Sequence, residues 1–143
     1  TLLLFPYETT LSTTKLLYAG IFERYPDLVL ILSHLGGVLP FLARRIDLGF
    51  ESETFPPRYR QIPRRPSEYM PKLYLDTALG WHRPAFECAQ DLVGIEHIVY
   101  GSDHFMRGGK FRPRIDEFLA GLNLPAADLE RIYGRNAEGL LFS

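Results

Sequence analysis

The chain has little of several features that mark particular classes of protein. Among 143 residues there is one cysteine, Cys88, so an internal disulfide is excluded and the sequence fits a reducing cytoplasm. No apolar run approaches the roughly 18 residues that a transmembrane helix needs, so we expect no membrane span. Sixteen basic and seventeen acidic residues leave a net charge of −1, which provides no basic excess for nucleic acid. We expect Cys88 to act as a small buried hydrophobe on a helix.

The hydrophobic content, 46%, is enough for one domain with a real core. Three segments are predicted to form buried strands, at residues 28–34, 72–78 and 97–103. Each is short, rich in Leu, Ile, Val or Tyr, and ends in a polar residue followed by a loop. Their apolar runs are nearly continuous rather than alternating, which is typical of parallel strands covered on both faces.

Helical patterns alternate with these strands and follow the last of them. They cover residues 9–26, 38–50, 83–94, 112–125 and 125–142. This alternation predicts an α/β fold. Residues 51–71 differ, because they hold five prolines and four arginines in a long excursion between a helix and a strand. The arginines could bind an anion, although a solvated loop is the simpler interpretation. They are Arg58, Arg60, Arg64 and Arg65.

Three chemically active side chains stand at the ends of the predicted strands: His34, Asp76 and Asp103. In parallel α/β folds the loops after the strand carboxyl ends share one face, where ligands bind. We therefore expect an imidazole and two carboxylates on one rim. Gly36 and Gly37 allow a tight turn beside the histidine. Such a histidine can move protons near neutral pH or bind a metal; taken alone, it could equally be structural, and Asp103 could cap the next helix.

The segment "ERYPDLVLILSHLGGVLPFLARRID", with "KLYLDTA" and "HIVYGSDHF" after it, resembles the amidohydrolase-related metal enzymes that include aminocarboxymuconate-semialdehyde decarboxylase. The closing helix with Asn136 and Ala137 resembles that family too. The family fold is a TIM (β/α)8 barrel, which typically needs about 250 residues. The resemblance implies that residues 1–143 form one partial barrel domain, strands six to eight with their flanking helices. We expect the chain to be a fragment or a truncated gene product.

The resemblance also implies a divalent metal, commonly zinc. The family binds it through a His-x-His pair on strand one, a histidine on strand five and an aspartate on strand eight. Only the last has a match here, Asp103, because the chain has no His-x-His pair. Asp103 would be a metal ligand that can also accept a proton from metal-bound water. His34 matches the strand-six histidine, which resembles a general acid or base. The remaining ligands are absent from this chain.

Arg45 matches an arginine that grips a substrate carboxylate in the family's decarboxylases, a task that suits bidentate guanidinium pairing. On a helix that begins near residue 38, it would lie roughly 10 Å from the helix start. The resemblance implies that it reaches a neighbouring subunit's site, which favours a homodimer. The alternative is a surface arginine paired with Asp47 or Glu51.

Further candidates for substrate contact are Trp81, His82 and His104, which follow the second and third predicted strands. For Asp76 a supporting role is expected rather than a catalytic one. His97 opens its strand, so we expect it at the opposite end of the fold with a structural role.

The sequence therefore predicts a metal-dependent carboxy-lyase, a non-oxidative decarboxylase, or a hydrolase acting on a small carboxylated substrate. A lactone or amide hydrolase of the same fold stays open, as does a noncatalytic half-barrel that pairs with another chain. A nucleotide-binding open sheet is disfavoured by the lack of a glycine-rich phosphate loop. Because part of a barrel leaves two sheet edges uncovered, we expect the isolated chain to be oligomeric or poorly soluble.

Overall fold

The computed structural model describes residues 2–78, 80–107 and 109–142. Its centre is a three-stranded parallel sheet in the order β1-β2-β3. The strands are β1 (Ile31–Leu32), β2 (Tyr74–Asp76) and β3 (Ile98–Val99). Each lies inside a segment that the sequence predicted as a strand, although each is shorter than that segment. The predicted α/β fold with parallel strands is confirmed.

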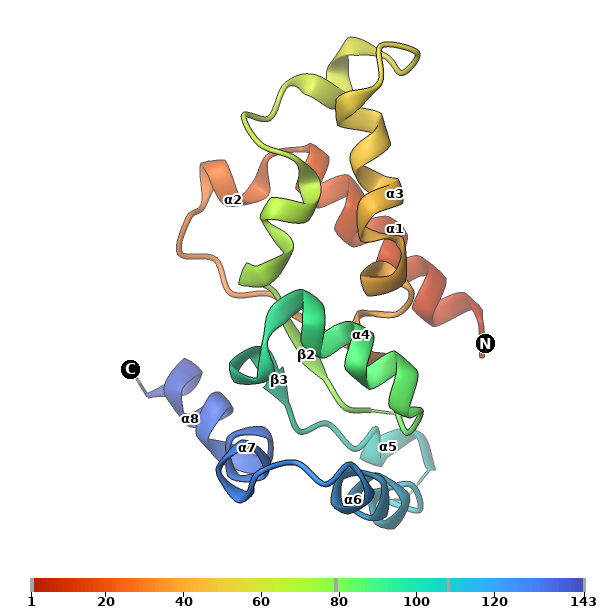
Figure 1. Cartoon of the computed structure of the whole chain (residues 1–143), viewed down its shortest axis with the longest axis vertical. Coiled ribbons are helices and arrows are strands. Elements are labelled where there is room, and N and C mark those ends of the chain that lie inside the picture. The colour runs from red at the N-terminus through yellow and green to blue at the C-terminus, as the bar shows by residue number, and fades with distance from the viewer. Residues whose placement is uncertain (1, 79, 108, 143) are drawn as a thin grey trace.

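Eight α-helices surround the sheet within the described part of the chain. Helices α1 to α3 lie on one side of the sheet along the long axis of the molecule, and α6 to α8 lie on the other (Figure 1). None of the described helices is long and apolar enough to cross a membrane. The helices are α1 (Leu4–Tyr18), α2 (Ile21–Arg24), α3 (Leu39–Glu51), α4 (Arg83–Val93), α5 (His104–Arg107), α6 (Arg112–Gly121), α7 (Ala126–Glu130) and α8 (Asn136–Leu141).

The first predicted helix, 9–26, is divided in the structure, so that prediction was wrong. Gly20 adopts a left-handed φ of 69°, which an α-helix cannot accommodate, and it begins α2 instead of continuing α1. The break turns the chain so that Phe22 enters the core, where it is 3% exposed. The helices predicted at 38–50 and 83–94 match α3 and α4 closely.

The core lies between the sheet and the helices that cover it. Leu75, in the central strand, is fully buried, as is Ile98 in β3. Burying a side chain of this size stabilises the fold by about 1.5–3 kcal/mol. Other members of the core include Leu39, Phe86, Leu119 and Ile132. By contrast, β1 pairs with β2 alone among the described residues, and Ile31 of β1 and Val29, two residues before it, are 54% and 47% exposed.

The proline-rich excursion after α3 is held to the fold by Asp47, which is completely buried. Its carboxylate accepts hydrogen bonds from the Ser67 backbone N–H at 2.9 Å and the Ser67 hydroxyl at 2.7 Å. It also accepts one from Arg44 at 2.8 Å, and Arg44 lies 3.9 Å from Glu51. The alternative in which Arg45 pairs with Asp47 or Glu51 was therefore wrong, because Asp47 pairs with the neighbouring Arg44 and Glu51 pairs with Arg65 at 2.7 Å.

The arginines of the excursion are mostly engaged within the chain. Arg64 pairs with Glu23 at 3.0 Å, and Arg65 pairs with Glu51 at 2.7 Å. Arg60 donates to the carbonyl of Ser52 at 2.9 Å. These contacts give the arginines a structural use, which favours the solvated-loop interpretation over an anion site.

Candidate functional site

A left-handed turn follows β1 and carries His34. The φ angles of His34, Leu35, Gly36 and Gly37 are 59°, 52°, 75° and 68°. Two backbone hydrogen bonds close the turn, from the N–H of Gly36 to the carbonyl of Ser33 at 3.1 Å and from that of Gly37 to the carbonyl of His34 at 3.0 Å. A left-handed conformation costs about 1–2 kcal/mol at a non-glycine residue. The surrounding contacts must offset this cost at His34 and Leu35, and Leu35 is buried to 3% exposure.

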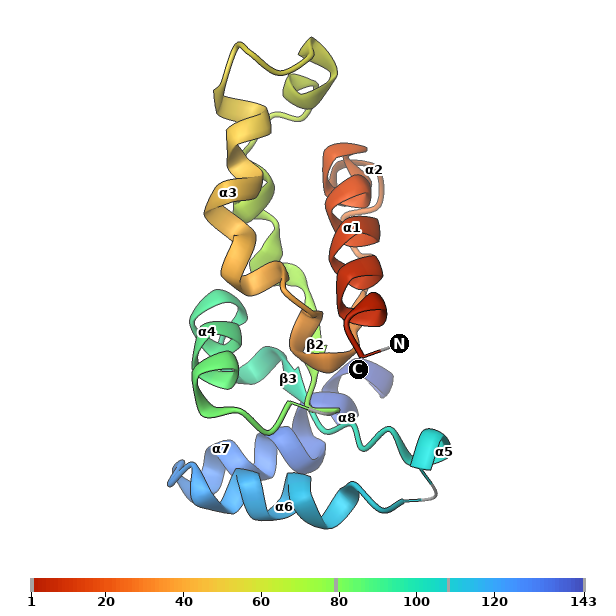
Figure 2. The same ribbon diagram turned by 90° about the vertical axis from the view of Figure 1, so that its right-hand side faces the viewer.

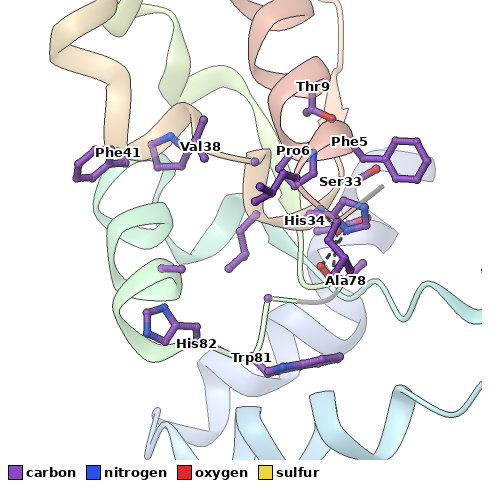
Figure 3. Close-up of a pocket in the computed structure, with 18 of the residues that line it drawn as sticks. Phe5, Pro6, Thr9, Ser33, His34, Val38, Phe41, Ala78, Trp81 and His82 are labelled. Carbon is purple, nitrogen blue, oxygen red and sulfur yellow. Dashed lines mark hydrogen bonds between the residues drawn. The ribbon is translucent and has the colours of Figure 1, made fainter.

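The imidazole of His34 is held by one of its two nitrogens. Nδ1 lies 3.1 Å from the carbonyl oxygen of Ala78, as Figure 3 shows. Because a carbonyl can only accept, Nδ1 carries the proton in this contact. The neutral ring therefore keeps Nε2 as its unprotonated nitrogen. His34 lines a cavity, so the ring is available to a bound molecule.

Asp76, at the end of β2, supports the same turn. Its Oδ1 accepts the backbone N–H of His34 at 2.8 Å and that of Ala78 at 3.0 Å. Burial raises the pKa of this carboxyl, an effect that the two N–H donors oppose and that the nearby Asp103 reinforces. Gly101 lies against the carboxyl group, since a Cβ there would stand 2.8 Å from the Asp76 Cγ.

Asp103 follows β3 and is half-buried, with a left-handed φ of 51°. The end of β3 is tied to the end of β2 by Thr77, whose hydroxyl donates to the carbonyl of Gly101 and accepts its N–H, both at 3.1 Å. Among the described residues, three of the four non-glycine residues with left-handed φ lie at this edge: His34, Leu35 and Asp103. Strained backbone of this kind gathers at functional sites.

These strand ends open into a cavity of about 1640 Å³. The three strand-end residues His34, Asp76 and Asp103 all line it, as the sequence led us to expect. Its wall is mostly apolar and comes from α1, α3 and α4, through residues that include Phe5, Pro6, Val38, Pro40, Phe41, Pro84 and Ala85. Three acidic residues line the cavity, Glu8, Asp76 and Asp103. No lysine or arginine belongs to the lining within the described residues.

Two of the predicted substrate contacts lie at this cavity. Trp81 and His82 line it before α4, across from Thr9 in Figure 3. The Trp81 ring lies 5.2 Å from that of Phe111, and the Arg114 guanidinium lies 5.8 Å from the Trp81 ring. These contacts fix the indole from the side of α6.

The remaining candidates lie apart from the described lining. His104 is exposed, with its ring 5.9 Å from that of Phe105. Arg45 is exposed on α3 and makes no ion pair or hydrogen bond to any residue that the structure describes. His97 precedes β3 at the opposite end of the sheet, where its ring stacks on Tyr74 at 4.3 Å.

Sequence reasoning missed two residues at or beside the cavity, Cys88 and Thr10. Cys88 is half-buried on α4 rather than hidden in the core, and it lines the cavity; burial raises the pKa of its thiol. Thr10 ties α1 to the turn after His34, because its hydroxyl donates to the carbonyl of Pro6 at 2.8 Å and accepts the N–H of Val38 at 3.0 Å. The packing of α1 over the turn, visible in Figure 2, brings Thr10 to Val38, 28 residues along the chain, so no local pattern signals this contact.

The described residues do not by themselves fit a metal ion. Nowhere in residues 2–78, 80–107 and 109–142 do three or more His, Cys, Asp or Glu side chains converge to hold one. Asp103 offers a carboxylate to the cavity, and oxygen ligands of this kind suit divalent cations. The other ligands of such a cation would have to come from outside the described residues.

A family model described as amidohydrolase matches residues 3–142, and the chain belongs to that family. Its relatives include decarboxylases. It is 30% identical to the 2-amino-3-carboxymuconate-6-semialdehyde decarboxylase of Dictyostelium discoideum, over 76% of this chain and 30% of that protein. It is 27% identical to the gamma-resorcylate decarboxylase of a Rhizobium species, over 69% of this chain and 30% of that protein.

Solved structures show the same relationship. A 2,6-dihydroxybenzoate decarboxylase, in complex with 2,6-dihydroxybenzoate, superposes with a TM-score of 0.81 at 26% identity, over 95% of this chain and 41% of that one. An amidohydrolase structure gives 0.85 at 25% identity, over 99% and 44%. A Polaromonas dihydroxybenzoic acid decarboxylase that contains manganese shares the fold, with a TM-score of 0.79 at 24% identity. The chain covers between 30% and 44% of the length of these proteins.

Proposed function

We propose that this chain forms strands six to eight of a (β/α)8 barrel in a divalent-metal-dependent, non-oxidative decarboxylase of small carboxylated substrates. The observation that carries the proposal is that His34 and Asp103, from different strands of one parallel sheet, line a single cavity at the strand carboxyl ends. The relationship to decarboxylases supports the reaction type.

The charge of the cavity bears on how a carboxylate could bind there. Its charged lining is acidic, from Glu8, Asp76 and Asp103, and would repel an anion. A carboxylated substrate therefore needs a compensating cation that the described lining does not supply. A divalent metal with Asp103 among its ligands would provide one. Arg45, exposed and without a partner among the described residues, would provide another to the cavity of a second subunit.

His34 is suited to the proton transfer that decarboxylation requires. Loss of CO2 replaces a carbon–carbon bond with a carbon–hydrogen bond, so an acid must deliver a proton to that carbon. The imidazolium of His34 would donate it from Nε2, because Nδ1 is held by the carbonyl of Ala78. A positioned general acid contributes about 10²–10⁴-fold to a rate.

The test is an assay of CO2 release by the protein expressed with whatever coding sequence lies upstream. Small hydroxybenzoates and carboxymuconate semialdehydes are the first substrates to try, since related enzymes carry those names. We expect His34→Asn and Asp103→Asn each to lower turnover at least about 100-fold. His97→Asn, a histidine at the other end of the sheet, and Asp91→Asn, an exposed aspartate of α4, are the matched controls and should keep near wild-type rates.

Undiminished CO2 release in either site variant would remove the role assigned to that residue. Turnover of a lactone or amide panel without CO2 release would replace the decarboxylase with the hydrolase of the same fold. Loss of activity in the controls to the same extent would show that the variants report on folding rather than on chemistry.

A noncatalytic half-barrel that pairs with another chain is the second candidate. Two observations favour it: the described residues form no metal site, and both β1 and β3 pair with β2 alone among them. Co-purification with a chain that supplies the missing strands, without turnover by the complex on any of these substrates, would support it over the decarboxylase.

A further inference from the structure

We infer that Asp76 is a positioning residue for His34: its carboxylate and the carbonyl of Ala78 together hold the left-handed turn and leave imidazole Nε2 for the cavity. The inference deepens the proposed function, on which it rests only for the use made of the imidazole.

The hydrogen bonds form a closed arrangement between two strand ends. Oδ1 of Asp76 accepts the backbone N–H of His34 at 2.8 Å and that of Ala78 at 3.0 Å. The carbonyl of the same Ala78 accepts from His34 Nδ1 at 3.1 Å. Both the backbone and the ring of His34 are therefore fixed by the short segment that ends β2.

A carboxylate suits this position better than a neutral acceptor. Hydrogen bonds to an ionised acceptor are about twice as strong as bonds between neutral groups, and the turn carries two non-glycine residues with left-handed φ, His34 and Leu35. The chain also leaves room for the carboxylate, because at Gly101 a Cβ would stand 2.9 Å from Oδ2 of Asp76.

The same contacts argue against direct proton transfer between Asp76 and the imidazole. The ring nitrogen on that side, Nδ1, bonds to the Ala78 carbonyl, and the Asp76 bond to His34 goes to the backbone N–H. Asp76 thus acts on His34 through geometry, by fixing the backbone from which the ring projects and the carbonyl that selects its tautomer.

The test is nuclear magnetic resonance of the protein expressed with its upstream sequence and labelled with 15N in histidine. Long-range 1H–15N spectra distinguish a protonated ring nitrogen from an unprotonated one, and loss of one set of signals in His34→Asn assigns them. In the wild type we expect Nδ1 protonated and the backbone amide proton of His34 shifted downfield. In Asp76→Ala we expect the ring to move toward the Nε2–H tautomer, which a free imidazole prefers, and the amide proton to move upfield.

Thr77→Val is the matched control. Thr77 is buried at the same strand end and also makes two side-chain hydrogen bonds to backbone, but both go to Gly101. The Thr77→Val variant should therefore be less stable than the wild type but keep the same His34 tautomer. An unchanged tautomer and amide shift in Asp76→Ala would overturn the inference, as would an equal change in Thr77→Val.

If Asp76→Ala does not fold, the same spectra of Asp76→Asn test the positioning role instead. It keeps an oxygen acceptor without the charge, so we expect the His34 amide proton to move part of the way upfield while Nδ1 stays protonated; no movement would overturn the inference. The two proposals fail separately. A changed tautomer in a protein that releases no CO2 leaves the positioning role intact, whereas an active enzyme with an unchanged tautomer removes only that role.

Discussion

Replacing Gly37 with alanine tests the packing that holds the His34 turn. Gly37 has φ 68° and ψ −122°, a conformation that glycine adopts and other residues avoid. A Cβ built at this position would stand 2.3 Å from the carbonyl oxygen of Pro6 and 2.9 Å from the hydroxyl oxygen of Thr10. Because the Pro6 oxygen belongs to the backbone, the first turn of α1 must move to admit the methyl group.

The expected loss of stability follows from two contributions. Strained backbone at residue 37 costs about 1–3 kcal/mol. Displacing α1 also weakens the hydrogen bond that joins it to the turn, from the Val38 N–H to the Thr10 hydroxyl, which is worth about 0.5–1.5 kcal/mol. The sum is about 3 kcal/mol, which corresponds to a fall in melting temperature of roughly 10 °C for a domain of this size.

The assay is thermal and urea unfolding of Gly37→Ala and Gly139→Ala, each compared with the wild type. At Gly139, within α8, an added Cβ meets nothing within 4 Å, so the same chemical change should stabilise the protein by about 0.5–1 kcal/mol through helix propensity. The reasoning is refuted if Gly37→Ala melts within about 2 °C of the wild type, or if both substitutions shift stability in the same direction.

Three further predictions concern stability and assembly. Asp47→Ala should lower the free energy of unfolding by about 3 kcal/mol, because it leaves the Ser67 N–H and hydroxyl without their buried acceptor; an unchanged urea midpoint would contradict this. Burial and Asp116 raise the pKa of Tyr100 from 10.0 to about 12, so its neutral form contributes stability that is present below pH 10 and is lost as the pH rises through about 12. Urea midpoints across that range should fall less steeply in Tyr100→Phe, and equal slopes would argue against the assignment. Since β1 and β3 have open edges among the described residues, sedimentation of the isolated chain should show oligomers or aggregates, and a cooperatively melting monomer would disprove it.

The general arrangement of the fold follows from local sequence patterns. Continuous apolar runs predicted the three parallel strands, and Gly94, with φ 80°, ends α4 where expected. Since parallel strands place their carboxyl ends on one face, the sequence also led to the set of His34, Asp76 and Asp103, which the structure places around one cavity.

Several features of the site depend on groups that carry no sequence signal. The carbonyl of Ala78 that holds Nδ1 is a backbone atom, common to every residue type. The left-handed φ of Leu35 is unfavourable for its residue type and is maintained by tertiary contacts. Arg44 and Arg45 are chemically identical and both are exposed. Only the helix phase, about 100° per residue, decides that Arg44 reaches Asp47 while Arg45 pairs with neither Asp47 nor Glu51.

The most direct test of the account is a crystal structure of the protein expressed with its upstream sequence and grown with Mn²⁺, whose anomalous signal locates the ion. We predict a carboxylate oxygen of Asp103 within about 2–2.5 Å of the metal, with Nε2 of His34 facing the same cavity. A metal bound without Asp103, or a His34 ring directed away from that cavity, would contradict the account.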